Sequence, residues 1–283
     1  MIDLHVHSTA SDGSTPPGEL PAMAAAAGLT AVALTDHDTV SGVAEFLEAG
    51  KAFPDLETIA GVELSCQYCS REMHIVGLFL NPENEEFQDY LNRQREERRE
   101  RAERIRTRLT SLGYPVSWED LRLAGAECSP GRPHFAKVLV EKYGFPDMQS
   151  VFQKLLKRGA AAYVPRQLPP PPEAIRAIHA AGGVAVWAHP VYREKNERAW
   201  VRRILRKFAP EPIGLDGIEA YYSLFGPGET ALVTEIAGTY GVALSGGSDF
   251  HGANTPNLQI GCGAGKLHVP DALLPLLKAR KRE

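Results

Sequence analysis

Short apolar runs alternate with helical patterns along much of this 283-residue chain, and that alternation limits the folds open to it. An apolar run at residues 2–6 precedes a helical pattern at 17–27, and a second run at 31–34 precedes a helical pattern at 40–51. Proline near the start of the first helical pattern and Gly28 just past its end are typical helix boundaries. The alternation predicts an α/β fold with a parallel sheet that is closed, or nearly closed, into a barrel.

The second half of the chain resumes this alternation. Two further apolar runs, at 58–64 and 73–80, complete the first part. In the second half, the expected strands are 183–188, 217–222 and 242–245, and the expected helices are 172–181, 200–208, 229–240 and 271–280. Apolar runs of this length suit buried strands, so both halves are expected to contribute to one sheet.

The middle of the chain has no convincing strand. We expect a long helix at 85–112, a short helix capped by Ser117, helices at 133–143 and 147–158, and a stiff proline-rich return at 168–172. The prediction is therefore a barrel built from residues 1–84 and 166–283, with a helical insertion or cap domain at 85–165. Arginine and glutamate alternate along the long helix, which is typical of a solvated face and is also compatible with an arginine edge that steers a phosphorylated substrate.

Composition excludes several classes of protein. A hydrophobic fraction of 43% and a charged fraction of 23% are ordinary for a globular protein and exclude collagen, coiled coil and disorder. The net charge of −4 argues against binding to duplex DNA. Without a membrane-length apolar stretch or a leader pattern, we expect a cytoplasmic protein that does not bind membranes. Cys66 and Cys69 have zinc-like spacing but lack the second pair of a structural zinc site.

Two histidines lie two residues apart in the first expected strand. Because alternate residues of a strand face the same way, His5 and His7 can point at one ion while Val6 faces the opposite side. Two imidazoles on a buried face need polar partners, so either a metal site or a structural role explains them at this point. Asp12 follows in a loop before Gly13, where it is either a ligand or a turn residue.

Ligand-type side chains recur near the ends of other expected strands. His37 lies between Asp36 and Asp38, directly after the run at 31–34, and the two carboxylates could orient it or cap the next helix. The remaining candidates are Glu63, His74, His189, Asp249 and His251. Barrel enzymes build their active sites where parallel strands end. Since several separate strand ends carry these residue types, we predict a polynuclear metal site.

The motifs together resemble a known family, the PHP (polymerase and histidinol phosphatase) metallophosphoesterases. The motifs are Asp3-Leu4-His5-Val6-His7-Ser8, Ser11-Asp12-Gly13, Thr35-Asp36-His37-Asp38, Gly61-Val62-Glu63 and Ser248-Asp249-Phe250-His251. The resemblance covers most of the chain outside the helical insertion. It implies a distorted (β/α)7 barrel, the PHP fold, with three divalent metal ions at the carboxyl ends of the strands. The implied ligands are His5, His7, Asp12, His37, Glu63, His74, His134, Asp249 and His251.

The resemblance also implies how the ligands divide among the ions. The first ion would take His5, His7, Glu63 and Asp249, the second Glu63, His74 and His134, and the third Asp12, His37 and His251. Imidazole and carboxylate ligands suit Mn²⁺, our first expectation, as well as Fe²⁺ or Zn²⁺. A hydroxide that bridges two ions would be the nucleophile, because coordination lowers the pKa of water toward 7.

The segments Gly131-Arg132-Pro133-His134 and Ala188-His189-Pro190 resemble the TrpH-like branch of the family. That branch implies removal of the 3′-phosphate from nucleoside 3′,5′-bisphosphates to give 5′-nucleotides such as AMP, and trimming of short RNA from its 5′ end. Arg132 and His189 are then the catalytic candidates. Arg132 would clamp phosphate, or it is a surface arginine at the start of a helix. His189 would contact phosphate or protonate the leaving oxygen, or it is a tenth ligand or a residue that orients a ligand. Arg132, His134 and His189 are the expected substrate contacts.

Three alternatives remain open at the level of sequence. One is another phosphomonoesterase of the same superfamily, such as a histidinol-phosphate phosphatase. A second is a degenerate metal-binding module without catalysis, although every expected ligand position is filled. The third is an amidohydrolase-type enzyme, because that fold also places a His-x-His motif at the end of its first strand. No strand-end lysine stands in the position of the usual metal-bridging group of those enzymes.

Overall fold

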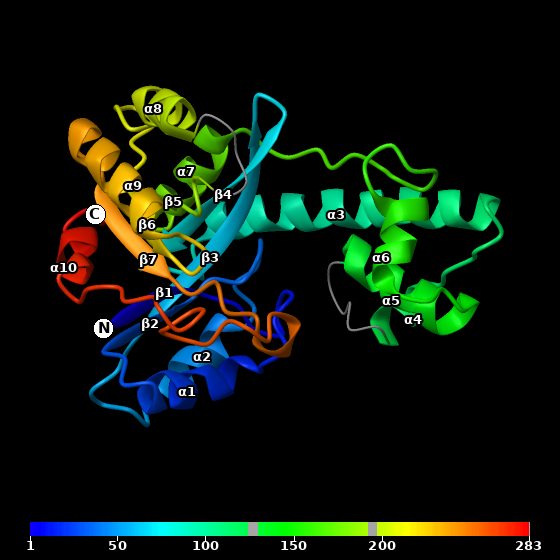
Figure 1. The fold of residues 1–283 in the computed structure, drawn as a ribbon, viewed down its shortest axis with the longest axis horizontal. Helices are drawn as coiled ribbons and strands as arrows, with labels where there is room; N and C mark the ends of the chain where they lie inside the picture. The colour runs from blue at the N-terminus through cyan, green and yellow to red at the C-terminus, as the bar shows by residue number, and fades with distance from the viewer. Residues whose placement is uncertain (124–129, 192–196, 283) are drawn as a thin grey trace. The chain divides into compact units, whose positions relative to one another are not determined.

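The computed structural model describes residues 1–123, 130–191 and 197–282 (Figure 1). The backbone forms two compact units, one made of Met1–Gln88 and Leu168–Glu283 and the other of Asp89–Gln167. We call them the barrel unit and the helical unit. The segment 85–165, which the sequence predicts to be a helical insertion, overlaps the helical unit, and its assignment as an insertion domain stays a prediction.

Seven strands form one sheet in the barrel unit, in the order in which they occur along the chain. Their bounds are β1 Ile2–Val6, β2 Ala31–Leu34, β3 Glu57–Tyr68, β4 Arg71–Leu78, β5 Val184–Trp187, β6 Gly217–Tyr222 and β7 Ala243–Gly247. Every residue of β1, β2 and β5 is buried, as expected of strands covered on both faces. The prediction of an α/β fold is confirmed.

One strand runs against the parallel direction that the sequence pattern predicts. β4 is antiparallel to both β3 and β5, whereas the other neighbouring strands pair in parallel. The connection explains the difference, because only Cys69 and Ser70 join β3 to β4, and both have a positive φ, as in a tight hairpin turn. A parallel crossover needs about a dozen residues. The prediction of a fully parallel sheet was therefore wrong at β4.

The sheet curls until its two ends nearly meet. The backbone N–H of His7 donates to the carbonyl of Phe250 at 2.9 Å, and that of Asp249 donates to the carbonyl of His5 at 2.8 Å. β1 thus pairs with the segment after β7, and the sheet becomes a nearly closed, distorted barrel. Gly247 permits this approach, because a Cβ at that position would lie 2.4 Å from the Cβ of His5.

Helices cover the outside of the barrel (Figure 1). α1 Leu20–Ala26 and α2 Val43–Gly50 lie on one side, and α7 Pro171–Ala180, α8 Glu197–Phe208 and α9 Pro227–Tyr240 lie on the other, while α10 Leu273–Lys278 packs near β7. Leu20 and Phe46 of the first pair are fully buried in a cluster that includes Val6. Burial of such a side chain contributes about 1.5–3 kcal/mol to the free energy of folding. Val6 thus belongs to this helix-covered cluster, and the neighbouring His5 and His7 face the opposite way.

The helical unit has a hydrophobic core of its own. Its elements are α3 Glu85–Ser111, which begins in the barrel unit, α4 Trp118–Leu123, α5 Arg132–Tyr143, α6 Met148–Val151 and a π-helical turn at Phe152–Leu156. Leu109, Phe135 and Leu139 are fully buried in this core. Ser117 caps α4 as predicted, because its hydroxyl accepts a hydrogen bond from the backbone N–H of Asp120 at 3.0 Å.

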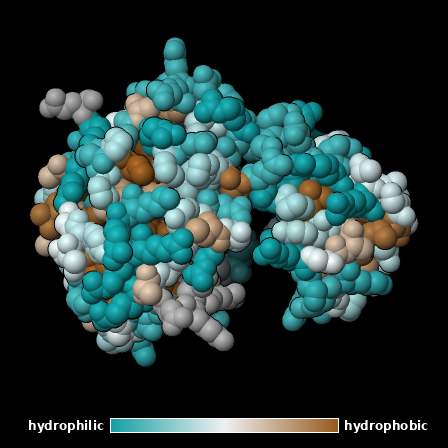
Figure 2. Space-filling model, turned by 90° about the horizontal axis from the view of Figure 1, so that it is seen from above, coloured by the Kyte–Doolittle hydropathy of each residue, from teal (hydrophilic) through white to brown (hydrophobic). Residues whose placement is uncertain are grey.

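The visible surface is mostly hydrophilic. In Figure 2 the coloured residues show hydrophobic side chains only as small, separate patches. Leu224 and Leu276 are examples of exposed apolar residues, at 51% and 59% exposure, and isolated cases of this kind are normal in proteins. Within the described residues, no helix has both the length and the apolar character to cross a membrane.

Candidate metal centre

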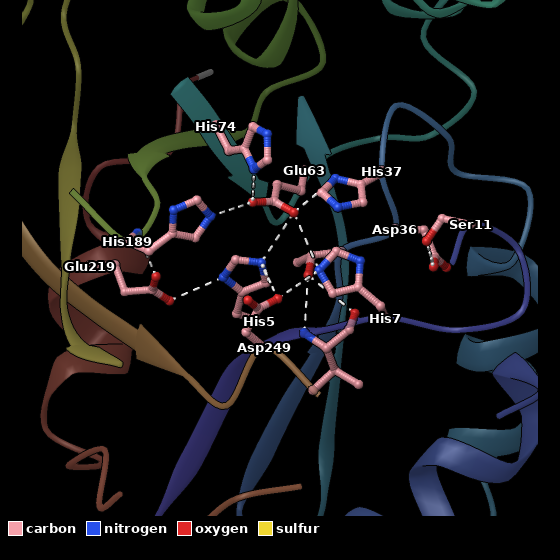
Figure 3. Close-up of polar contacts among 12 residues, drawn as sticks. His5, His7, Ser11, Asp36, His37, Glu63, His74, His189, Glu219 and Asp249 are labelled. Atoms are coloured by element: carbon pink, nitrogen blue, oxygen red, sulfur yellow. Dashed lines mark hydrogen bonds and ion pairs between the residues drawn. The ribbon is translucent and has the colours of Figure 1, made fainter. Parts of the chain in front are cut away.

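Side chains from several strands converge on the carboxylate of Glu63, which is 1% exposed (Figure 3). Its Oε2 atom lies 3.0 Å from Nδ1 of His37. The same oxygen lies 3.3 Å from the Nε2 atoms of both His5 and His7. The two histidines of β1 therefore face one point, as their spacing predicts, and His37 reaches it from the segment after β2.

The other oxygen of Glu63 faces two more histidines. Its Oε1 atom lies 2.9 Å from Nδ1 of His74 and 3.1 Å from Nε2 of His189. His74 lies within β4 rather than at a strand end. The antiparallel pairing places His74 opposite Ser65, two residues along β3 from Glu63. One buried carboxylate thus lies among five imidazoles.

Two further carboxylates complete the cluster. Oδ1 of Asp249, just after β7, lies 3.2 Å from Nε2 of His7 and 3.5 Å from Nε2 of His5. Oδ1 of Asp12 lies 3.3 Å from Nε2 of His251. The Asp12 side chain is 49% exposed, so the cluster is open to solvent on that side.

Several of the buried atoms have no hydrogen-bond partner among the described residues. They are Nε2 of His5, both ring nitrogens of His7, Nδ1 of His37 and Oε2 of Glu63. Each unsatisfied buried group costs about 1–3 kcal/mol, and native proteins contain few of them. Imidazole and carboxylate lone pairs that face one another at close range are the ligands of divalent transition metals. The residues present therefore fit a metal site.

Three groups of side chains bring their ligand atoms within 4.8 Å of one another. The groups are His7, Asp12, His37 and His251; His5, His7 and Glu63; and His37, Glu63 and His74. His7, His37 and Glu63 each belong to two of the groups. Neighbouring ions held by these groups would therefore share ligands.

Charges within the cluster oppose the effect of burial on its titrating groups. Burial disfavours charged His7, but the nearby carboxylates of Asp249 and Glu63 raise its pKa to about 10. Burial also acts against charged His74, whereas the charge of Glu63 raises its pKa to about 10. Burial would raise the pKa of Glu63, but the charges of His37 and His74 hold it well below its usual value. Cations at these nitrogens would take the place of protons.

A carboxylate that the sequence analysis missed holds two of the histidines. Glu219, on β6 and 2% exposed, lies 3.1 Å from Nδ1 of His5 through Oε1 and accepts a hydrogen bond from the backbone N–H of His189 at 2.8 Å through Oε2. A carboxylate behind a ligating imidazole fixes the tautomer and orientation of its ring. The available signal was an acidic residue inside the apolar run at 217–222, because a buried charge needs a partner.

The carboxylates beside His37 accept hydrogen bonds from two neighbouring segments of the chain. Asp36 accepts hydrogen bonds from the backbone N–H of Ser8 at 2.8 Å and from the hydroxyls of Ser8 and Ser11 at 2.6 and 2.5 Å. Asp38 accepts from the backbone N–H of Ser65 at 2.8 Å and from its hydroxyl at 3.0 Å. These two aspartates therefore fix the segments that carry the neighbouring candidate ligands.

His189 differs from the other histidines of the cluster in its backbone. Its φ is 31°, a conformation uncommon for a residue with a Cβ, and the hydrogen bond to Glu219 helps to hold it. Its side chain is 20% exposed. A pocket of about 310 Å³ opens beside His189 and His74. His189 can therefore reach both the cluster and a ligand in the pocket.

Arg132 and His134 lie at the start of α5 in the helical unit. Nδ1 of His134 accepts a hydrogen bond from the backbone N–H of Gly131 at 3.1 Å, which satisfies the first turn of the helix. The guanidinium of Arg132 lies 5.9 Å from the ring centroids of Phe152 and Tyr163. The predicted roles, a phosphate contact for Arg132 and a metal ligand and substrate contact for His134, stay predictions.

Comparison with known proteins places this arrangement in a family. Residues 3–112 match the PHP domain. The 5′-3′ exoribonuclease Rnm of Salmonella typhimurium is 37% identical over 253 residues, which cover 89% of this chain and 85% of the relative. The 3′,5′-nucleoside bisphosphate phosphatase of Chromobacterium violaceum is 34% identical over 261 residues, which cover 92% of this chain and 90% of the relative.

A solved structure extends the comparison to the fold. A protein from Bifidobacterium adolescentis, described as a metal-dependent phosphoesterase, aligns with a TM-score of 0.82 and 28% identity over 100% of this chain and 96% of its own. The motifs, the barrel and the full-length relatives agree. The chain belongs to the PHP family and is a hydrolase that acts on phosphate esters.

Proposed function

We propose that the protein removes the 3′-phosphate of nucleoside 3′,5′-bisphosphates to give 5′-nucleotides such as AMP, and also releases 5′-nucleotides from the 5′ end of short RNA. The observation that carries the proposal is the set of unsatisfied nitrogens around Glu63. Such a set binds cations, and cations assist the hydrolysis of phosphate esters with poor leaving groups. The full-length relatives from Salmonella typhimurium and Chromobacterium violaceum support the two substrates.

A single step serves both substrates. Water attacks the phosphorus bound to the 3′ oxygen of the first nucleoside, the P–O3′ bond breaks, and O3′ leaves with a proton. In the bisphosphate the remaining phosphate oxygens are free, whereas in RNA one of them carries the next nucleotide. A site that leaves this oxygen uncovered can therefore hydrolyse both.

We further propose three divalent ions, with Mn²⁺ as the first expectation and Fe²⁺ or Zn²⁺ as alternatives. The nine ligands would be His5, His7, Asp12, His37, Glu63, His74, His134, Asp249 and His251. The sharing of Glu63 between two groups of ligand atoms supports its role as a bridge. Bound ions would lower the pKa of a water molecule and offset the negative charge that grows on phosphate during the reaction.

His189 is the proposed donor of the leaving-group proton or a phosphate contact. Its Nε2 atom lies 3.1 Å from Glu63, while part of its ring remains exposed. An imidazolium at the edge of the cluster can protonate O3′ as the bond to phosphorus breaks. Glu219, which holds the backbone N–H of His189, would keep the ring directed toward the scissile bond.

Arg132 is the proposed phosphate contact in the helical unit. Burial and then the charges of Arg132 and Arg166 lower the pKa of Arg101 to about 10, so the like charges of these guanidinium groups repel one another. A group of like charges attracts an anion, and a guanidinium can bind phosphate through two parallel hydrogen bonds. We therefore propose that this arginine group binds a phosphate of the substrate.

The cysteines bear on the cellular location of the protein. Among the described residues, Cys69 and Cys262 form no disulfide, which fits the reducing environment of the cytoplasm. We propose that the protein is cytoplasmic and that its partners are small phosphorylated nucleotides and short RNA ends.

The test compares phosphate release from adenosine 3′,5′-bisphosphate and from histidinol phosphate, before and after chelation and reloading with Mn²⁺. We expect metal-dependent release from the bisphosphate, with AMP as the nucleotide product. Asp249→Asn should keep the circular-dichroism spectrum and lose turnover. A preference for histidinol phosphate would support the alternative phosphatase, and hydrolysis that survives exhaustive chelation would refute the metal mechanism.

A further inference from the structure

We propose that basic and aromatic side chains on the β3–β4 hairpin and α8 bind the nucleotides that follow the scissile phosphate of a single-stranded RNA. The surface, which we call the Trp200 strip, consists of Tyr68, Arg71, Trp200, Arg203 and Lys207. The proposal rests on the proposed function, because it assigns a place to the part of the RNA that a mononucleotide substrate lacks.

The strip begins at the candidate metal centre. The pocket of about 310 Å³ is lined by His74 and His189, which both contact Glu63, and also by Arg71 and Trp200 of the strip. His74 and Arg71 lie three residues apart on β4, roughly 10 Å along the strand, so the lining of the pocket reaches from the cluster to the strip. A chain that leaves the reaction centre through this pocket therefore meets Arg71 and Trp200 first.

Basic groups and aromatic rings contact one another along the strip. Cζ of Arg71 lies 4.4 Å from the ring centroid of Trp200. The rings of Trp200 and Tyr68 are stacked, with centroids 6.1 Å apart and an angle of 29° between their planes. Nζ of Lys207 and Cζ of Arg203 lie 4.9 and 5.7 Å from the Tyr68 centroid. Two segments far apart in the sequence thus form one surface beside the pocket.

This pattern matches the chemistry of single-stranded nucleic acid. Bases stack on aromatic rings and on guanidinium planes, and their phosphates need nearby cations. Arg203 and Lys207 are exposed, and Trp200 and Tyr68 are partly exposed, so both kinds of contact are available. Glu72 also lines the pocket, but its Oε1 atom lies 3.6 Å from Nε2 of His74, which places its charge at the catalytic end.

The reaction explains why the strip should matter for RNA alone. In RNA the scissile phosphate keeps its bond to the 5′ oxygen of the second nucleotide, so the remainder of the strand must leave the cluster by some path. The pocket and the Trp200 strip provide a path with stacking and positive charge. A nucleoside bisphosphate ends at this phosphate and does not extend along the strip.

The test uses two double variants that each remove two positive charges from α8. Arg203→Gln with Lys207→Gln alters the strip, whereas Arg198→Gln with Arg202→Gln removes arginines that pair with Glu235 on α9. Each protein is assayed on a 5′-phosphorylated RNA pentamer and on adenosine 3′,5′-bisphosphate. We expect kcat/KM for the pentamer to fall about tenfold in the strip variant and less than about twofold in the control.

Salt dependence and direct binding provide readouts beyond activity at one condition. For the strip variant, the slope of log affinity against log salt should become shallower by about 1.4, or about 0.7 for each lost phosphate contact. Anisotropy of a labelled pentamer with the inactive Asp249→Asn protein measures that affinity. Trp200→Leu in that background should weaken binding by about fivefold or more through lost stacking, with its melting temperature as the folding control.

The outcomes separate this proposal from the proposed function. If the strip variant and the control lose equal activity on the pentamer, the strip proposal is wrong and the phosphatase proposal stands. A strip variant that loses bisphosphate activity as strongly as pentamer activity also overturns it, because the strip would then bind the first nucleotide. A wild-type protein that cleaves the bisphosphate but neither binds nor cleaves the pentamer overturns the strip proposal and the RNA part of the proposed function, while the phosphatase part stands.

Discussion

Two buried carboxylates in the barrel unit, Asp36 and Glu63, differ in how their oxygens are satisfied. Asp36 accepts three hydrogen bonds from Ser8 and Ser11, so both of its oxygens have donors. Glu63 is as deeply buried, yet its Oε2 atom faces imidazoles without a hydrogen bond. The difference separates a carboxylate that stabilises the fold, Asp36, from one with an oxygen available to a metal ion, Glu63.

This contrast is informative because the same kind of sequence signal draws attention to both residues as functional candidates. Each is an acidic residue at or near the end of an apolar run, and residue type alone does not distinguish them. The distinction lies in the partners. Hydroxyl and amide hydrogens donate hydrogen bonds to Asp36, whereas several imidazole nitrogens surround the carboxylate of Glu63. Burial of unsatisfied groups opposes folding. Cations that bind these groups should therefore raise the free energy of unfolding of the protein.

The largest effect should come from Glu63→Gln. Loss of the shared carboxylate should reduce turnover about a thousandfold or more, because stabilisation by metal ions is worth several kcal/mol. Steady-state kinetics and metal analysis measure the change. If the variant kept full metal content and near-normal turnover, the contrast with Asp36 would disappear.

Asp36→Asn should affect stability instead of the chemistry of the site. An amide in place of the carboxylate brings hydrogens against the donors of Ser8 and Ser11, and the expected loss is about 2–3 kcal/mol in the free energy of unfolding. Urea denaturation with metal present measures it. The folded fraction should still bind metal, and a variant of unchanged stability would contradict the structural role.

An intermediate effect is expected for Glu219→Gln. Glu219 orients His5 and the backbone of His189 without facing the centre of the cluster, and loss of such support typically costs about 10–100-fold in activity or metal affinity. Metal titration and kinetics together distinguish this result from a general loss of fold, which thermal unfolding of the same sample would reveal.

The smallest effect should come from Tyr222→Phe. The hydroxyl of Tyr222 donates to Oδ2 of Asp249 at 2.9 Å. Its removal deletes one hydrogen bond behind a proposed ligand, and turnover should fall about two- to tenfold. Kinetics at saturating Mn²⁺ checks the value, and a loss as large as that of Glu63→Gln would give Tyr222 a direct role in the reaction.

Much of the fold and the site was accessible from sequence because the signals were local. The apolar runs marked all seven strands, and the His-x-His spacing in β1 indicated the face on which His5 and His7 lie. Buried strands seldom carry several ionisable residues without a function. The candidate ligands in the barrel unit were therefore identifiable before their geometry was known.

The features that escaped prediction depend on contacts between distant segments. Cys69 and Ser70 form the hairpin turn without the Asn-Gly or Asp-Gly pair that usually marks one, so the direction of β4 was not visible. Glu219 is one acidic residue in a strand, and its partners lie on β1 and after β5. The Trp200 strip joins residues separated by more than a hundred positions, and no local pattern connects them.

The reversal of β4 has a consequence for how enzymes of this shape can change. The register of the hairpin fixes Glu63 opposite Val76 and His74 opposite Ser65, and a slip of one residue would turn every side chain of the strand to the other face. The turn itself lies beyond that ladder. With the proposed role of the Trp200 strip, sequence changes near the tip would alter which RNA ends bind, while the candidate ligands at the base of the hairpin stay unchanged.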